Sequence, residues 1–146
     1  MAEMGEDPRL AALGALIGDW TTSITMLNAD GTAGAVSRAS DIYRWSANSK
    51  FVEHHVDAEM GDARLRSLEI IALDPVGSGY VTRSYDPDGS FSDFTAALDG
   101  KSWRITGEVQ RFSGSFSDDG NTLSGRWEQQ ADGQWSPLMT VTLRRL

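Results

Sequence analysis

The stretch from Asp99 to Asn121, DGKSWRITGEVQRFSGSFSDDGN, contains the pattern that decides the fold. Both of its ends are rich in Asp, Asn and Gly, which tolerate left-handed backbone dihedrals or form Asx turns. Two sets of side chains between these ends each share one face of an extended chain: Trp103, Ile105 and Gly107, and then Phe112, Gly114 and Phe116. The segment 102–118 is too long for one ordinary strand. We therefore expect a joint near 108–110 and two antiparallel strands.

The same succession of turns and extended segments fills the chain after Trp20. The other turn signals are Asn28-Ala29-Asp30-Gly31, Asn48-Ser49, Gly61-Asp62, Asp74 to Gly79, Asp86-Pro87-Asp88-Gly89 and Asp132-Gly133. Between them no segment has a convincing 3.6-residue period, and alternation continues, for instance at Trp20, Thr22, Ile24 and Met26. Nine joints therefore separate ten predicted strands.

Ten strands joined by short turns predict an antiparallel meander, because short hairpins connect strands that are neighbours in space. An open meander has two unpaired edges, and closure into a barrel removes both. Segments such as 33–40 and 113–117 carry small or polar groups on both faces, which indicates a cavity instead of a solid aliphatic core. We predict an all-β, up-and-down barrel of about ten strands.

One short helix is predicted to precede the barrel. Leu10, Leu13, Leu16 and Ile17 recur at helical spacing, after Asp7 as N-cap and Pro8 at the first helical position. Composition does not shift abruptly along the 146 residues. We therefore expect a single domain over 1–146, with the helix over 7–17 and the barrel over 19–145.

Charge and composition exclude several classes of function. The net charge is −8, and the 13 Lys and Arg residues are scattered, so we expect neither nucleic acid nor a membrane surface as a partner. The chain has no cysteine, which excludes disulfides, thiolate metal sites and thiol nucleophiles. The mildly apolar stretch 10–18 follows acidic residues and is too short to span a bilayer. We expect a cytoplasmic protein.

Gly18-Asp19-Trp20, which follows the predicted helix, resembles the Gly-x-Trp signature that opens lipocalins and their calycin relatives. In that superfamily the Trp closes one end of the barrel by stacking against an Arg of the last strand. The resemblance implies the same structural closure between Trp20 and Arg144, in the terminal Arg144-Arg145 pair. A guanidinium stacked on an indole is a cation–π contact, which suits a barrel floor.

The chain is also similar to a family of uncharacterised bacterial lipocalin-like proteins, through the segments Leu13 to Trp20 and Trp135 to Arg144. Among better-known calycins, nitrobindins bind ferric heme through a His near the C-terminus, and fatty-acid-binding proteins hold a carboxylate with interior Arg and Tyr. No His follows residue 55 here. We therefore expect no heme and no other cofactor.

The two histidines, His54 and His55, are adjacent on a predicted strand and point to opposite faces. They cannot share a metal ion, and we predict no metal site. His55 would lie on the face of Phe51, Glu53 and Asp57, whereas His54 would lie with Val52, Val56 and Ala58, which form the more natural core face. At most one histidine faces the interior.

Aromatic and arginine side chains are further candidates for a ligand site. Aromatics stack on planar ligands but also dominate ordinary cores. A buried Arg would clamp a carboxylate. Of the arginines in predicted strands, namely Arg83, Arg104, Arg126 and Arg144, most are expected on the outer face, and an interior place is favoured more for Arg144 than for the others because of its role at the barrel base. The candidate ligand-binding residues are His54, His55, Tyr80, Phe94, Trp103, Trp127 and Arg144. No residue is assigned a catalytic role.

These observations predict a protein that binds a small apolar or amphipathic molecule inside its barrel. One alternative is a small cofactor-free enzyme, isomerase-like or cyclase-like, that uses Glu53, His54, His55 and Asp57. It requires one of these groups to face inward with a perturbed pKa. Another alternative is a structural homodimer that pairs an outer sheet face and has a barrel filled by side chains.

Overall fold

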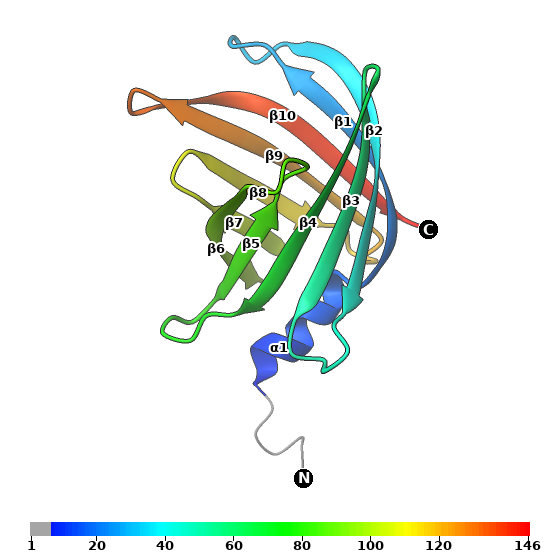
Figure 1. Cartoon of the computed structure of the whole chain (residues 1–146), viewed down its shortest axis with the longest axis vertical. Coiled ribbons are helices and arrows are strands. Elements are labelled where there is room, and N and C mark those ends of the chain that lie inside the picture. The colour runs from blue at the N-terminus through cyan, green and yellow to red at the C-terminus, as the bar shows by residue number, and fades with distance from the viewer. Residues whose placement is uncertain (1–6) are drawn as a thin grey trace.

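Turns rich in Asp, Asn, Gly and Ser connect ten antiparallel strands in the computed structural model, which describes residues 7–146 (Figure 1). The strands are β1 (Gly18–Leu27), β2 (Ala33–Trp45), β3 (Val52–Met60), β4 (Ala63–Leu73), β5 (Tyr80–Tyr85), β6 (Phe91–Asp99), β7 (Ser102–Thr106), β8 (Gln110–Phe116), β9 (Thr122–Ala131) and β10 (Gln134–Arg145). Each strand pairs with its neighbours in sequence. The nine predicted joints, including the weak one at 108–110, all lie at or within a residue of the gaps between strands.

Closure of the barrel comes from pairing between the first and last strands. β1 and β10 run antiparallel, with a register that extends from Trp20 opposite Arg145 to Met26 opposite Met139. No strand edge remains open in this ring, because the strand order returns from β10 to β1. The predicted all-β, up-and-down barrel is therefore confirmed.

The N-terminal helix is shorter than predicted. The α-helix α1 covers Pro8–Ala12, and the next turn, Leu13–Ala15, is a 3₁₀-helix (η2). Asp7 caps α1 by accepting a hydrogen bond from the Arg9 backbone N–H at 2.9 Å. Gly14 lowers helix propensity in the second turn, and the chain then turns into β1 at Gly18, where φ is +140°. The helix therefore ends before residue 17.

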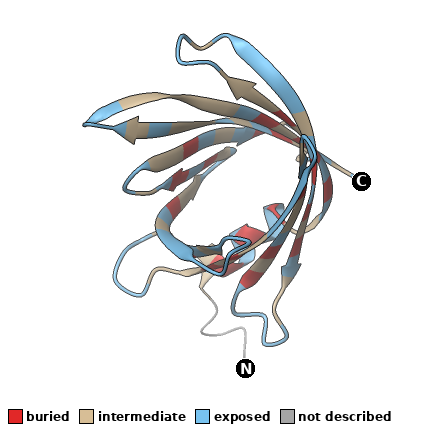
Figure 2. Cartoon of the chain, turned by 45° about the horizontal axis from the view of Figure 1, so that its top comes forward, coloured by how far each residue is buried: buried red, intermediate tan, exposed pale blue. Residues whose placement is uncertain are grey.

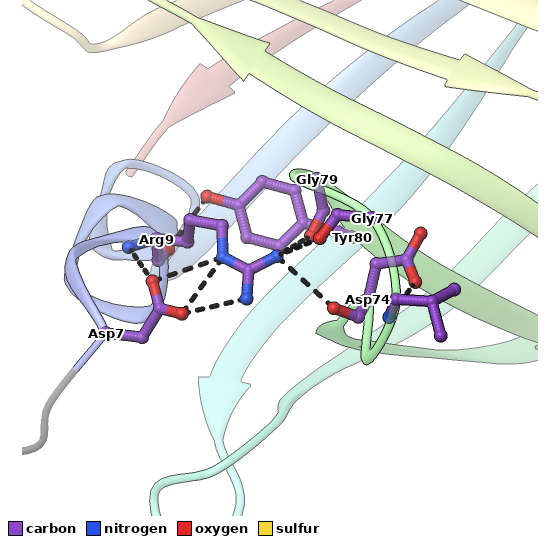
Figure 3. Close-up of polar contacts among 7 residues, drawn as sticks. Asp7, Arg9, Asp74, Gly77, Gly79 and Tyr80 are labelled. Atoms are coloured by element: carbon purple, nitrogen blue, oxygen red, sulfur yellow. Dashed lines mark hydrogen bonds and ion pairs between the residues drawn. The ribbon is translucent and has the colours of Figure 1, made fainter.

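Arg9 attaches this helix to the loop between β4 and β5 (Figure 3). Its guanidinium donates to the backbone carbonyls of Gly77 at 3.0 Å and Gly79 at 2.9 Å, and it also pairs with Asp7 at 2.8 Å. In return, the Tyr80 hydroxyl donates to the Arg9 carbonyl at 2.7 Å. These contacts hold α1 across one end of the barrel, which we call the floor.

The floor is closed by Arg145, not by the predicted Arg144. Cζ of Arg145 lies 4.1 Å from the centroid of the Trp20 ring. Alternation along β10 places Leu143 and Arg145 on the side of Trp20, and it turns Arg144 outward, where it is exposed. The prediction was therefore wrong by one residue, which on a strand reverses the face.

Polar contacts reinforce this floor. Arg145 donates hydrogen bonds to the carbonyls of Ile17, Ala15 and Gly120. The Trp20 indole N–H donates to the Leu16 carbonyl at 2.9 Å. One arginine thus joins η2, β10 and the β8–β9 turn, and it satisfies carbonyls that the end of η2 leaves free.

Buried side chains gather at the floor and thin out toward the other end. Leu13, Leu16 and Trp20 are at most 1% exposed. Figure 2 shows buried residues on the strand segments near α1, whereas the turns at the far end are exposed. Among residues 7–146, no helix is long and apolar enough to cross a membrane. The strands above the floor enclose the candidate site.

Candidate functional site

An interior cavity of about 630 Å³ lies inside the barrel. One part of its lining is aromatic and comes from β6 to β9, with Phe94, Trp103, Phe112 and Trp127. Another part is polar and comes from β1 to β4, with Thr22, Asp41, Tyr43, His54 and Glu69. The strand order places β3 and β8 on opposite sides of the ring. The cavity therefore has an apolar side and a polar side.

Strand register brings the polar residues together. His54 on β3 lies directly opposite Tyr43 on β2 and Glu69 on β4. Asp41 is two residues from Tyr43 on the same strand, so alternation places it on the same inward face. Residues from β2 and β4 therefore lie beside His54 inside the barrel.

His54 is held between two carboxylates. Nε2 lies 2.6 Å from Asp41 Oδ1, and Nδ1 lies 2.9 Å from Glu69 Oε1. The Thr22 hydroxyl donates to the other Asp41 oxygen, Oδ2. Each of Asp41, His54 and Glu69 is at most 9% exposed. A buried chain of hydrogen bonds thus crosses β1, β2, β3 and β4.

The electrostatics of this group favour a charged imidazole. Burial lowers the pKa of His54, but the hydrogen bonds and negative charges of Asp41 and Glu69 outweigh that effect and raise the pKa to about 9. At neutral pH His54 is therefore an imidazolium. Both N–H groups of the ring donate, one to each carboxylate.

Tyr43 covers one face of this imidazolium. The two ring centroids are 3.8 Å apart, and the planes are inclined by 10°. Burial, followed by the charges of Asp41 and Glu69, raises the pKa of the Tyr43 phenol well above its ordinary value, so the phenol stays neutral. The stacked ring keeps His54 in place and adds a hydroxyl to the cavity lining.

The aromatic side of the cavity is held by close packing. The Trp127 ring lies 5.3 Å from the Phe112 ring and 6.3 Å from the Phe94 ring, between centroids. The Phe112 ring lies beside Gly114 of its own strand, β8, and Gly125 of the neighbouring β9, where any Cβ would collide with the ring. These two glycines therefore let the aromatic ring lie against the barrel wall.

Four of the seven predicted ligand-site residues line the cavity: His54, Phe94, Trp103 and Trp127. His55 points outward and contacts Glu53 at 3.0 Å, with nearly half of its side chain exposed. Tyr80 is buried in the floor, where it contacts Arg9 and Trp103. Arg144 is exposed on the outer wall. A binding role for the four that line the cavity stays a prediction.

The other predicted charged residues lie outside the cavity. Arg83, Arg104 and Arg126 are all exposed. Asp57, from the acid/base strand of the enzyme alternative, pairs on the outer face with Arg64 at 2.6 Å. His54 therefore shares the interior with carboxylates from adjoining strands, and not with Glu53 or Asp57 of its own strand.

Sequence reasoning missed Asp41, Glu69, Thr22 and Tyr43. The signal that could have found the two acids is a charged residue on the same face of a strand as a buried hydrophobic one. Asp41 precedes Tyr43 by two residues, and Glu69 precedes Ile71 by two. Neither residue is near His54 in sequence, so their meeting depends on the register of β2, β3 and β4. Within 7–146, no group of three or more His, Asp or Glu side chains is arranged to hold a metal ion.

No family model matches this chain, and no curated protein matches it. Among solved structures, the crystal structure of Rv2717c from M. tuberculosis is similar, with a TM-score of 0.68 and 15% sequence identity. The similarity covers 96% of this chain and 98% of that one. At this identity the similarity supports the fold alone.

Proposed function

We propose that this protein binds a small amphipathic molecule inside its barrel. The observation that carries the proposal is the two-sided cavity of about 630 Å³, with aromatic rings on one side and the buried Asp41–His54–Glu69 group on the other. Ligand cavities usually measure about 300–1,000 Å³ and combine apolar walls with a few fixed polar groups. The size and the lining both support a drug-sized ligand.

The hydrogen bonds of His54 favour binding over acid–base catalysis. Both ring nitrogens already face carboxylate oxygens, at 2.6 and 2.9 Å, so neither is free to exchange a proton with a substrate. A pKa of about 9 also leaves the ring without a basic lone pair at neutral pH. The inward histidine that the enzyme alternative requires is therefore present, but neither of its ring nitrogens is free to act on a substrate.

The volume of the cavity counts against the structural alternative. A barrel that serves only as a dimerising scaffold needs no interior space, because side chains fill small barrels and empty space weakens packing. A cavity of about 630 Å³ costs stability unless it has a use. Whether two copies associate through an outer face is a separate question, which light scattering answers.

A neutral dye tests the proposal. N-phenyl-1-naphthylamine emits strongly in apolar surroundings, so binding in the cavity will raise its emission. Ser67 lines the cavity and its neighbour Arg66 is exposed, with 67% of the side chain accessible. Ser67→Trp will occupy part of the cavity volume and reduce dye affinity about tenfold. Forcing extra atoms into a filled space costs about 1–3 kcal/mol, and a tenfold change in affinity corresponds to about 1.4 kcal/mol. Arg66→Trp, its control, will leave the affinity unchanged.

Two results would contradict the proposal. The first is a wild-type protein that does not bind the dye, and the second is equal dye affinity in wild type and Ser67→Trp. Thermal unfolding followed by circular dichroism will show that both variants are folded. Native mass spectrometry of protein purified from its own host will then show whether a small molecule accompanies the chain.

A further inference from the structure

The polar side of the cavity carries an excess of negative charge. Two carboxylates, Asp41 and Glu69, surround one imidazolium, which leaves one net negative charge in the buried group. Glu69 uses Oε1 for His54, and no hydrogen bond among residues 7–146 involves its Oε2. Glu69 is 9% exposed and lines the cavity. Because Oε2 is not fully enclosed and has no donor from the described part of the protein, it is open to a hydrogen bond from a ligand in the cavity.

No positive side chain of the described chain balances this charge from within the cavity. The lining residues include neither Lys nor Arg, and His54 is already shared between its two carboxylates. An anionic ligand would therefore meet repulsion at the polar end and find no guanidinium to bind its carboxylate. The interior differs in this respect from a site built for a fatty acid.

The open end of the barrel is acidic as well. Five turns lie at the end opposite α1 (Figure 1), and we call them the mouth turns: 28–32, 61–62, 86–90, 107–109 and 132–133. Each contains at least one acidic residue, and none contains Lys or Arg: the acidic residues are Asp30, Asp62, Asp86, Asp88, Glu108 and Asp132. Asp86 and Glu108 also line the cavity. A mouth of one sign of charge concentrates ligands of the opposite sign.

Arginines beside the mouth turns do not cancel this field inside the barrel. Arg64 pairs with Asp57 at 2.6 Å, and Arg111 pairs with Glu128 at 2.8 Å. Arg126, whose guanidinium is near Gly31, is exposed and does not line the cavity. These three arginines lie outside the cavity, two of them paired with carboxylates, whereas acidic residues lie at the opening and at the polar end.

From this arrangement we infer that the ligand is an organic cation: a protonated amine on an apolar, preferably aromatic, body, whose ammonium donates to Glu69 Oε2. Its body lies against Phe94, Trp103 and Trp127 on the other side of the cavity. Aromatic faces attract cations as well as apolar groups, so both sides of the cavity suit such a molecule. This inference rests on the proposed function, because it names the ligand class of the same cavity.

Three probes with one body and different charges test the ligand class. They are 3-phenylpropylamine, which is a cation at pH 7, the neutral 3-phenylpropanol, and the anion 3-phenylpropionate. Isothermal titration calorimetry at low salt will show the amine binding about tenfold more tightly than the alcohol, because the ammonium makes a charge-assisted hydrogen bond. The anion will bind more weakly than the alcohol.

A matched pair of variants locates the effect. Glu69→Gln keeps the shape of the side chain and removes its charge, so it will lower amine affinity about tenfold and change alcohol affinity less than twofold. Glu53→Gln makes the same chemical change on the outer face of β3, where Glu53 contacts His55, and it will leave all three affinities unchanged. The double variant Asp86→Asn/Glu108→Gln, which leaves the interior group intact, will slow amine association.

The outcomes separate this inference from the proposed function. If the neutral dye binds but the anion binds as tightly as the amine, the ligand class is wrong and the binding function stands. Unchanged amine affinity in Glu69→Gln, with dye binding intact, also overturns the ligand class. If neither the dye nor any of the three probes binds wild-type protein, both proposals fail.

Discussion

At the scale of the single residue, His54 combines burial with a positive charge. A lone buried imidazolium would lose its proton, because burial disfavours the charged form. Asp41 and Glu69, at 2.6 and 2.9 Å, reverse that preference and raise the pKa to about 9. The charge on His54 is therefore part of what holds β2, β3 and β4 together.

Stability should depend on pH through this residue. The pKa of His54 is about 9 in the folded chain, above its ordinary value of 6.5, so the folded state binds the proton more tightly. The resulting stabilisation is complete below about pH 6.5 and is lost as pH rises through about 9, with a total on the order of 3 kcal/mol. Urea unfolding at several pH values between these limits will measure the decline.

The adjacent histidine supplies the control for that experiment. His55 is on the outer face, so His55→Gln will retain the decline in the free energy of unfolding with pH. His54→Gln will be less stable at pH 6 and will show a much flatter profile. The same steep decline in both variants would contradict an imidazolium at residue 54.

Sequence reasoning left open which histidine faces inward, but it gave His54 the more natural core face because its neighbours at alternate positions are apolar. It could not identify Asp41 and Glu69, which lie 13 and 15 residues away from His54. Periodicity assigns a face within one strand, but contacts between strands depend on register, which no local pattern contains. The sequence therefore favoured the face on which His54 lies, and its carboxylate partners were not predictable.

At the scale of the elements, the turns were predictable and the helix end was not. Each turn depends on residues inside it; for example, Asp88 accepts a hydrogen bond from the Ser90 backbone N–H at 3.0 Å. The end of the helix depends instead on how the floor is built, since Leu13 and Leu16 are fully buried there. Tertiary packing sets that boundary and propensity only contributes to it.

The two terminal arginines test the floor. Arg145→Leu removes the stack on Trp20 and the hydrogen bonds to three carbonyls, so it should lower the free energy of unfolding by about 2–4 kcal/mol. Arg144→Leu, one residue away on the outer wall, should change it by less than about 0.5 kcal/mol. Urea unfolding compares the two, and equal losses would show that the floor does not depend on the stack.

At the scale of the whole molecule, closure of the barrel followed from counting strands and edges. Ten strands connected by short turns leave two edges, and the pairing of β1 with β10 removes them. The distribution of charge did not follow from composition. A net charge of −8 does not reveal that acids line the mouth and the polar end while arginines remain outside, because that division depends on which face each strand turns inward.

Binding of an organic cation requires a molecule that lies inside the barrel with its charged end on Glu69. A crystal structure of the protein soaked with 3-phenylpropylamine measures this directly. We expect the amine nitrogen within about 3.2 Å of Glu69 Oε2, the reach of a hydrogen bond, and the phenyl ring against Trp103 and Trp127. An amine bound only on the outer wall, or a cavity that holds only water at saturating amine, would contradict binding of a cation inside the barrel.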